Sequence, residues 1–533
     1  MTTTPDRGVA VIGNGPVGQT TALLLARWGV PVVLLDGRAG RDPVGSKAIC
    51  QQRDVLDVWE SVGAGRRIAA EGLTWTTART FHRGHELFAY DLADPGVSAF
   101  PPFVNISQAR TEQILDERIA AEPLIDVRWG RRVTGVDQDD AGVTLAVEGH
   151  EPVRAAYAVA CAGARGEDIR RALGVGFDGH SFDDRFLICD IRADLPGWAR
   201  ERRFHFDPAW NPGRQVLIHP CPGSTFRIDW QVPGDYDLAA EEAGGALDAR
   251  IRAVIGDAPY EIVWKSVYRF HSRIADRMRV GRVLLAGDCA HLVSPFGARG
   301  LNSGVGDAEN AAWKLAFVLH GWADERLLES YHDERHAAAR ENIAVTTATM
   351  DFLVPHTAEQ HARRRAVLQG APTDPALRAQ VDSGRLAEPF WYTESPLTTP
   401  DPSRPFAGRP PRGAVPQAGP GIVVPDVPVS VAGSACGRFR ELARDGVLLL
   451  TTAGADVEPP PGIDAPVRVL HLPDIDLTGK LAEALAARPG EVWVIRPDAH
   501  VAAVLTDPAE VAPAVHRSLA RAVTDRILPG AAT

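Results

Sequence analysis

A glycine-rich turn near the amino terminus has the residue types and spacing of a dinucleotide-binding site. An apolar run at residues 9–13 leads into a G-x-G-x-x-G pattern and a helix-forming stretch, and a second apolar run at 31–35 ends at Asp36. The glycines let the backbone approach a pyrophosphate, the helix N-terminus favours its negative charge, and the acid accepts hydrogen bonds from a ribose. Asp36 favours FAD or NAD over NADP, because a 2′-phosphate would meet a like charge. The predicted contacts are Gly13, Gly15, Pro16, Val17, Gly18, Asp36, Gly37 and Arg38.

A second glycine-rich loop lies in the middle of the chain. Residues 282–286 are typical of a buried strand, and Gly287 and Asp288 follow directly. After Pro295 and Phe296, small and apolar residues recur at helical spacing from Gly304 onward. The chain thus repeats the order of strand, glycine-rich loop and helix, and we expect both loops to serve one cofactor.

The elements between and after these loops have different patterns. Residues 180–275 contain alternating apolar and polar side chains, which predicts a sheet with one apolar face. Residues 396–427 are rich in proline and glycine and are expected to form a linker. An apolar run at 446–450, an amphipathic stretch at 477–487 and the run at 491–500 then predict a short β/α unit.

Composition excludes several classes of protein. The chain has 533 residues, a net charge of −11 and 45% hydrophobic residues, which fits a folded protein of three or four domains and argues against a nucleic-acid partner. Only four of the 57 basic residues are lysines, which we attribute mainly to coding bias. No apolar run is long enough to span a membrane, and no signal-peptide pattern is present, so a cytoplasmic location is expected.

The cysteines and histidines predict neither a disulfide framework nor a metal site. The six cysteines are scattered without a C-x-x-C pair. His332 and His336 have i, i+4 spacing but lack the neighbouring glutamate of H-E-x-x-H, so we expect an exposed helix face there and no metal.

The second loop and the helix after it resemble the FAD-dependent class A aromatic monooxygenases. The pattern of that family is G-D-A-A-H, a proline, G-x-G-x-N-x-G and then D-x-x-N-x-x-W-K-L. This chain matches it at Gly287, Asp288, Ala290, His291, Pro295, Gly300, Asn302, Gly304, Asp307, Asn310, Trp313, Lys314 and Leu315. Residues 331–335 resemble the Y-x-x-E-R that follows, and Arg496-Pro497-Asp498 resembles the C-terminal thioredoxin-like domain of a subgroup that includes 3-(3-hydroxyphenyl)propionate hydroxylases and polyketide hydroxylases.

The resemblance implies roles for particular residues. Asp288 would accept hydrogen bonds from the ribityl hydroxyls of the flavin, and the amides around Gly300, Leu301 and Asn302 would open a helix at its pyrimidine end. Further FAD contacts are implied in Ser46-Lys47-Ala48 and in residues 108–112: Lys47, Ala48, Gln108 and Arg110. The apolar face of the predicted sheet would lie over the flavin and bind an aromatic substrate, in a region that includes Trp230, Tyr268, Phe270, Pro295 and Phe296.

One segment departs from the family pattern. The family carries an Asp-Gly motif near position 160 that borders the flavin and nicotinamide region, and this chain has Ala162 where the Asp is expected, with one extra residue before Arg170. Glu167 or Asp168 could compensate from a shifted position. The departure bears on reduction by a nicotinamide more than on FAD binding.

The expected fold class is α/β. We predict a split Rossmann-like FAD-binding domain with an inserted β-sheet substrate domain and a C-terminal thioredoxin-like domain without C-x-x-C, whose only cysteine is Cys436. The predicted boundaries are 1–180 for the first part of the FAD domain, 181–274 for the substrate sheet, 275–395 for the second part with a helical region, 396–427 for the linker and 428–533 for the last domain.

The resemblance implies an enzyme of secondary metabolism that hydroxylates a phenolic or polyketide-type aromatic ring. NADPH or NADH would reduce FAD, O2 would form a flavin C4a-hydroperoxide, and the ring would attack it. A catalytic base is not identified by any motif, and a homodimer stays open. Two alternatives remain: an FAD-dependent oxidase or dehydrogenase without external NAD(P)H, which Ala162 motivates, and a non-catalytic FAD-binding partner protein.

Overall fold

A mostly parallel sheet of six strands forms the centre of the dinucleotide-binding region. The computed structural model describes residues 8–43, 45, 47–92, 94, 98–411, 414–430 and 437–521, so Ser46 and Cys436 lie outside the described residues. The strand order is β17-β18-β11-β1-β2-β7. The strands are β1 (Val9–Ile12), β2 (Val32–Leu35), β7 (Ile125–Arg128), β11 (Tyr157–Ala160), β17 (Arg279–Val280) and β18 (Val283–Leu285).

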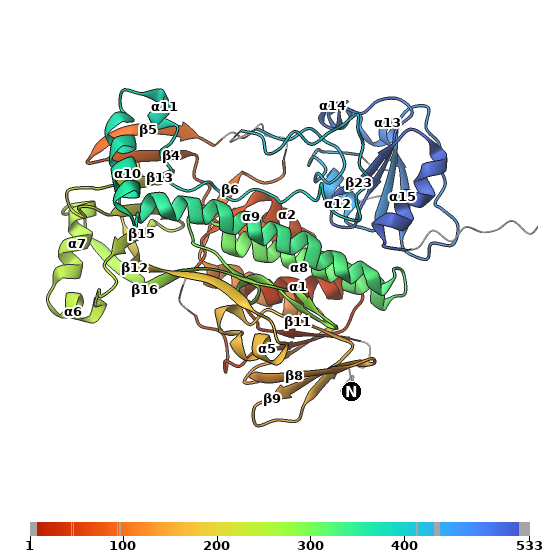
Figure 1. Cartoon of the computed structure of the whole chain (residues 1–533), viewed down its shortest axis with the longest axis horizontal. Coiled ribbons are helices and arrows are strands. Elements are labelled where there is room, and N and C mark those ends of the chain that lie inside the picture. The colour runs from red at the N-terminus through yellow and green to blue at the C-terminus, as the bar shows by residue number, and fades with distance from the viewer. Residues whose placement is uncertain are drawn as a thin grey trace, which may run out of the picture.

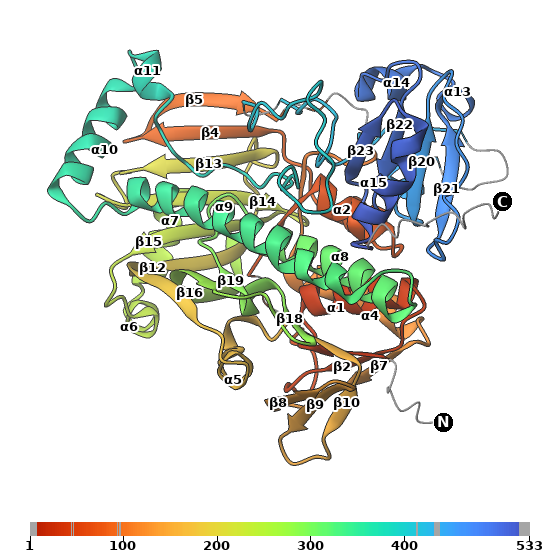
Figure 2. The same cartoon turned by 45° about the vertical axis from the view of Figure 1, so that its right-hand side comes forward.

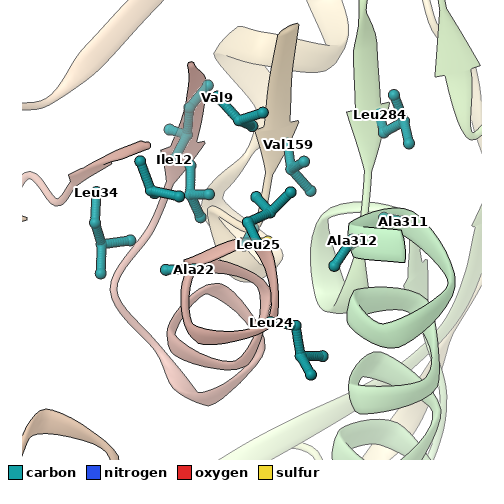
Figure 3. Close-up of a cluster of buried hydrophobic side chains, with 14 of the residues drawn as sticks. Val9, Ile12, Ala22, Leu24, Leu25, Leu34, Val159, Leu284, Ala311 and Ala312 are labelled. Carbon is teal, nitrogen blue, oxygen red and sulfur yellow. The ribbon is translucent and has the colours of Figure 1, made fainter. Parts of the chain in front are cut away.

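This sheet is assembled from two separate segments of the chain. β18 pairs in parallel with β11 although five strands of the second sheet, β12 to β16 (residues 177–275), lie between them in sequence, which confirms the predicted split. β1, β2, β11 and β18 are buried throughout, as expected for parallel strands covered on both faces. On one face pack α1 (Pro16–Arg27) and α8 (Arg299–Leu319), and Figure 3 shows Leu25 of α1 and Ala311 of α8 facing Val159 and Leu284 of the sheet.

Further elements surround the central sheet. Figures 1 and 2 show that α8 lies beside the long helix α9 (Glu329–Leu353). A small antiparallel sheet has the order β10-β9-β8, and a two-stranded sheet pairs β3 with β6. The bounds are α2 (Arg53–Glu60), α3 (Gly65–Glu71), α4 (Gln108–Ala120), α5 (Glu167–Ala172), β3 (Cys50–Gln52), β6 (Phe103–Asn105), β8 (Val133–Asp139), β9 (Gly142–Val147) and β10 (Val153–Ala155).

The second large sheet has eight strands in the order β19-β16-β12-β15-β14-β13-β4-β5. Two of its strands, β4 and β5, come from the segment assigned to the first FAD-binding part, so the sheet is more than a single insertion. Its strands are β4 (Thr77–His82), β5 (His85–Asp91), β12 (Phe177–Ala193), β13 (Glu201–Phe206), β14 (Gln215–Cys221), β15 (Thr225–Val232), β16 (Tyr260–Ala275) and β19 (His291–Leu292). The helices α6 (Leu238–Ala243), α7 (Ala246–Ile255), α10 (Ala358–Gly370) and α11 (Pro375–Arg378) complete this region.

A separate four-stranded sheet lies at the C-terminal end, beside the dinucleotide-binding region (Figure 2). Its order is β21-β20-β22-β23, with β20 parallel to β21 and antiparallel to β22. The elements are α12 (Phe439–Ala443), β20 (Val447–Thr451), β21 (Val467–His471), α13 (Leu472–Ile475), α14 (Lys480–Leu485), β22 (Val492–Ile495), β23 (Val501–Leu505) and α15 (Val511–Ser518).

The predicted linker is an ordered strap with buried residues. Val424 and Val427 belong to the core of the C-terminal sheet, and Arg404 is buried with its guanidinium donating to the Glu491 carboxylate at 2.8 Å. The described residues of this segment, 396–411 and 414–427, form no helix or strand, yet several of their side chains are buried like those of a domain. Within the part of the chain described, no helix is long and apolar enough to cross a membrane, and the five described cysteines are all free.

Candidate functional site

One cavity joins the two glycine-rich loops. Its volume is about 650 Å³, and it lies between the carboxyl ends of β1 and β2 and the second large sheet, the place where open α/β sheets bind ligands. The predicted residues that line it are Gly13, Gly15, Pro16, Val17, Asp36, Gly37, Arg38, Lys47, Ala48, Gln108, Phe270, Asp288, Pro295, Phe296, Gly300 and Leu301.

The structure shows why each of three positions in the first loop requires glycine. Gly13 has a φ of +107°, and a Cβ there would lie 2.3 Å from the carbonyl oxygen of Cys161. A Cβ on Gly18 would lie 1.8 Å from the carbonyl oxygen of Gly13. Gly15 lines the cavity, and no atom of the described residues lies within 4 Å of its Cβ position. Gly13 and Gly18 therefore allow the tight turn, while Gly15 leaves its side open to a ligand.

Two helix N-termini meet at the cavity. α1 begins after Gly15 and α8 begins after Ala298, and neither has a side-chain cap or an acidic residue in its first turn. Ala298 has a left-handed backbone with a φ of +57°, which turns the chain into α8. Uncapped N-termini present unpaired N–H groups and partial positive charge, so both helices are ready to bind negatively charged groups of a ligand.

Asp36 is held as an oriented carboxylate at the end of β2. It accepts hydrogen bonds from the backbone N–H of Asn14 at 2.8 Å and from the backbone N–H of Arg38 at 2.8 Å, and the Arg38 guanidinium binds both carboxylate oxygens at 3.0 Å. Burial opposes ionisation, but these bonds hold the pKa of Asp36 below its usual value. Asp288 also lines the cavity. Desolvation by the surrounding protein raises the pKa of Asp288, and the charges of His291 and Lys47 oppose that rise.

Four predicted cofactor residues do not line the cavity. Arg110 is bound to the Glu71 carboxylate, with its Nε donating at 2.6 Å. Asn302 accepts a hydrogen bond from the backbone N–H of Gln52 at 3.1 Å and so joins α8 to β3. Gly287 packs against Val17, and Gly18 supports the turn. Gly18, Gly287 and Asn302 thus shape the loops from behind, whereas the FAD contact predicted for Arg110 stays a prediction.

On strand β15 of the second sheet the polar side chains face the cavity, which corrects the expectation that its apolar side chains do so. Neighbouring strands contribute apolar side chains to the same wall: Phe186, Ile188, Leu217 and Phe270. Ile228, Trp230 and Val232 pack with Leu247 and Ile251 of α7, on the side away from the cavity. The alternate residues of β15, Arg227 and Asp229, line the cavity. The alternation predicts that the strand has one apolar and one polar face, and α7 covers the apolar face.

Three of the five residues predicted for the substrate region line the cavity: Phe270, Pro295 and Phe296. Trp230 is fully buried in the α7 core, and Tyr268 lies beside Trp264, with ring centroids 6.3 Å apart, outside the lining. Phe270 and Phe296 do line the cavity together with Phe186, which sequence reasoning missed. The ring centroids of Phe186 and Phe270 are 4.5 Å apart, and those of Phe186 and Phe296 are 5.4 Å apart.

Several polar residues of the cavity also escaped prediction from the sequence. They occupy the inward positions of β13, β14 and β15, and the signal that could have found them is the polar half of the alternation. They are Arg202, His219, Arg227 and Asp229.

The segment that departs from the family pattern borders the cavity. Ala162 and Asp168 line it, whereas Glu167 is exposed and paired with Arg171. Asp168 is bound to Arg132 at 3.0 Å. Arg170 is buried and donates to the backbone carbonyl of Cys289 at 3.1 Å, so it supports the second glycine-rich loop. Of the two acids, only Asp168 lines the cavity.

Comparison with known proteins identifies the family. A family model described as an FAD binding domain matches residues 6–346. The 3-(3-hydroxy-phenyl)propionate/3-hydroxycinnamic acid hydroxylase of Mycobacterium sp. (strain JLS) is 31% identical over 381 residues, which cover 70% of this chain and 65% of the relative. The para-nitrophenol 4-monooxygenase of Pseudomonas sp. (strain WBC-3) is 30% identical over 387 residues, which cover 70% of this chain and 94% of the relative. The chain belongs to the family of the FAD binding domain.

The fold also matches solved structures. The flavin-dependent monooxygenase PieE, solved with FAD and substrate, aligns over 97% of this chain and 99% of its own, with a TM-score of 0.83 and 23% identity. The p-nitrophenol 4-monooxygenase PnpA from Pseudomonas putida DLL-E4 aligns over 71% of this chain and 99% of its own, with a TM-score of 0.61 and 27% identity. The first likeness extends through the C-terminal sheet.

The cavity fits FAD on its own chemistry. The open side of Gly15 and the uncapped start of α1 suit a pyrophosphate. Asp36 offers an ionised carboxylate to a ribose. The start of α8 offers N–H groups at a second point of the same cavity, as a long dinucleotide requires.

Proposed function

We propose that this protein is an FAD-dependent monooxygenase that hydroxylates a phenolic or polyketide-type aromatic ring with NAD(P)H and O2. The observation that carries the proposal is one cavity that both glycine-rich loops line together with three phenylalanines, Phe186, Phe270 and Phe296. The names of the two relatives, a hydroxyphenylpropionate hydroxylase and a nitrophenol monooxygenase, support an aromatic substrate.

Different residues of the cavity would bind different parts of FAD and of the substrate. Gly15 and the start of α1 would hold the pyrophosphate, Asp36 the ribose, Asp288 the ribityl hydroxyls and the start of α8 the pyrimidine end of the flavin. FAD supplies the redox chemistry when bound, since it accepts a hydride from the nicotinamide and activates O2. The three phenylalanines would pack the aromatic ring and exclude water.

The reaction is tested by stopped-flow mixing of the oxidised flavoprotein with NADPH or NADH in the presence of a phenol. Bleaching of the flavin, followed by reoxidation in O2 and formation of a hydroxylated product, supports the proposal. Absence of bleaching with both donors contradicts it and favours the oxidase or dehydrogenase alternative, for which Ala162 at the cavity wall is the specific observation. Absence of any NAD(P)H turnover or substrate oxidation would favour a non-catalytic FAD-binding partner protein.

The same proposal extends to the rest of the chain. We infer that the C-terminal unit is thioredoxin-like and lacks redox chemistry by a pair of thiols, because its sequence contains a single cysteine, Cys436. The free thiols of the five described cysteines support a reducing compartment such as the cytoplasm. A homodimer is the assembly to test by light scattering, in which the mass of the species in solution decides.

A further inference from the structure

Four polar side chains on neighbouring strands form the inner wall of the cavity. In the register of the sheet, His219 of β14 lies opposite Arg227 of β15, and Leu217 lies opposite Asp229. Arg202 of β13 lines the same cavity. Residues at opposed and alternate positions share one face of a sheet, so these groups face the same ligand. We call Arg202, His219, Arg227 and Asp229 the cavity cluster.

The two arginines of the cavity cluster are held by the protein. Arg227 binds both oxygens of Asp190 on β12, at 2.8 and 2.9 Å, and also donates to the backbone carbonyl of Lys47. Arg202 donates to the backbone carbonyl of Ser383 at 2.9 Å. Their cationic groups are therefore positioned before any ligand binds.

The two other members have polar atoms without a partner. The Oδ1 of Asp229 and the Nδ1 of His219 are buried and make no hydrogen bond within the described part of the chain. Buried polar atoms are almost always hydrogen-bonded, and leaving one unpaired destabilises the folded state. Their position at the cavity wall indicates that a ligand supplies the missing partner.

The electrostatics of the cluster favour a ligand that becomes an anion. Burial raises the pKa of Asp229 to about 7, with Asp190 adding to the rise and Arg227 and Arg202 opposing it. Burial and the same two arginines lower the pKa of His219 well below its usual value, so its imidazole is neutral. Near neutral pH the wall therefore combines the Arg202 cation and the Arg227–Asp190 ion pair with a carboxylate that readily accepts a proton.

We propose that Asp229 is the base that accepts the proton of the substrate's ring hydroxyl, and that Arg202 and Arg227 stabilise the phenolate that forms. The inference rests on the proposed function and narrows its substrate to aromatic rings whose hydroxyl group reaches this wall. The O–H bond breaks, the proton moves to a carboxylate oxygen of Asp229, and the electron pair stays on the ring oxygen, where it makes the ring more nucleophilic. His219 offers a neutral hydrogen-bonding group beside it.

The direct test observes the phenolate in the oxidised flavoprotein, without turnover. Phenol, 3-(3-hydroxyphenyl)propionate and para-nitrophenol are titrated into the protein above pH 7, and difference spectra record the phenolate band of the bound ligand. We expect the wild-type protein to form phenolate without releasing a proton to the solvent, because Asp229 takes it up. In Asp229→Asn we expect phenol and 3-(3-hydroxyphenyl)propionate to bind as neutral phenols, whereas para-nitrophenol, which ionises by itself near neutral pH, is the reference that is phenolate in both proteins. For the two weakly acidic phenols, a phenolate band of equal size in Asp229→Asn, no band in the wild type, or no binding of either would overturn the inference.

Kinetics provide a second readout that separates this inference from the proposed function. In the wild type, kcat/KM should rise with pH around 7, because the base must be ionised. Asp229→Asn should lower kcat about 100-fold, with KM changed much less and the rise near pH 7 lost, and Asp229→Glu should restore part of the rate. Normal turnover in Asp229→Asn contradicts only the role of Asp229, whereas a wild type without flavin reduction contradicts the proposed function.

Matched controls guard against a structural explanation. Asp183→Asn removes an exposed carboxylate from β12 of the same sheet, where the side chain is 87% exposed. It should leave the phenolate band and kcat unchanged. FAD content and the thermal unfolding midpoint of both variants report whether they fold. If Asp229→Asn does not fold, the shift of the pH profile in Asp229→Glu tests the role of Asp229 instead.

Discussion

Two buried charge clusters in this protein differ in how completely their hydrogen bonds are satisfied. The cavity cluster leaves atoms of Asp229 and His219 without a partner. The second group, which we call the interdomain cluster, consists of Lys314, Glu334, Arg496 and Asp498 and joins α8 and α9 to the C-terminal unit. In the interdomain cluster every carboxylate oxygen accepts at least two hydrogen bonds.

The interdomain cluster has the geometry of a structural joint. Arg496 donates to both oxygens of Glu334, at 2.5 and 3.0 Å, and to both oxygens of Asp498. Despite their burial, Arg496 and the other cations hold the pKa of Glu334 and of Asp498 well below the usual range. Each of these side chains is at most 1% exposed. A saturated buried cluster has no capacity left for a ligand, so its role is to hold two parts of the fold together.

This joint continues to the second glycine-rich loop. Arg335 follows Glu334 on α9, and its Nε donates to Asp307 at 2.7 Å. Asp307 in turn accepts hydrogen bonds from the backbone N–H of Gly287 at 2.9 Å and from His291 at 2.7 Å. The residues that match the family pattern after the loop thus brace the backbone that presents Asp288 to the cavity. The two clusters differ in whether every polar atom has a hydrogen-bond partner within the protein. Fully bonded buried charges hold the fold together, whereas buried charges with unbonded atoms can bind a ligand.

The largest effect is expected from Arg496→Met. This change leaves the carboxylates of Glu334 and Asp498 buried without their main cation, which should lower the free energy of unfolding by about 3–5 kcal/mol. Urea unfolding followed by tryptophan fluorescence measures it. Arg326→Met is the control, since Arg326 forms an exposed pair with Asp324 and should leave the unfolding midpoint unchanged. Equal effects of the two changes would mean that the interdomain cluster is not a joint.

A smaller effect is expected from Asp307→Asn. Burial alone would raise the pKa of Asp307, but His291 and Arg335 bring it to about 2, so the group is a carboxylate. Its loss should loosen the loop that carries Asp288 and weaken FAD binding about tenfold, the loss expected from one charged hydrogen bond. Titration of the apoprotein with FAD, followed by flavin fluorescence, measures the affinity. Asp333→Asn, on the exposed side of α9, is the control. An unchanged FAD affinity in Asp307→Asn would mean that Asp307 does not support the cofactor site.

Asp229→Asn should have the opposite effect on stability from Arg496→Met. Removing an unpartnered carboxylate should raise the free energy of unfolding by about 1 kcal/mol at pH 8. Because burial raises the pKa of Asp229 to about 7, its contribution to wild-type stability is present below pH 4 and is lost as the pH rises through 7. This pH dependence should be reduced in the variant. Chemical unfolding at a series of pH values tests it, and destabilisation at pH 8 would place Asp229 among the structural charges.

The smallest effect is expected from Arg110→Ala. Arg110 binds Glu71 outside the cavity, so FAD affinity should change less than twofold. Lys47→Met is the comparison, since Lys47 lines the cavity and should weaken FAD binding more. A larger loss in Arg110→Ala than in Lys47→Met would restore the cofactor contact that the sequence resemblance implies.

Much of the cofactor end could be predicted because its signals are local. Gly13, Gly15 and Asp36 lie within one strand, turn and strand, and the backbone conformations they require follow from their own types and spacing. The roles of Asn302 and Arg110 could not be read in this way, because their partners, Gln52 and Glu71, come from distant segments. The same holds for Glu334 and Arg496, which belong to different motifs and become partners only in the folded chain.

The sequence by itself determined that this chain has two glycine-rich loops for one dinucleotide and a sheet whose two faces differ. The tertiary structure alone decided which side chains of β15 face the cavity. A period of two residues separates Ile228 and Trp230 from Arg227 and Asp229 but does not say which set points inward. The apolar side chains of β15 point away from the cavity because burying them against Leu247 and Ile251 of α7 is energetically favourable. The polar side chains of the same strand therefore face the cavity.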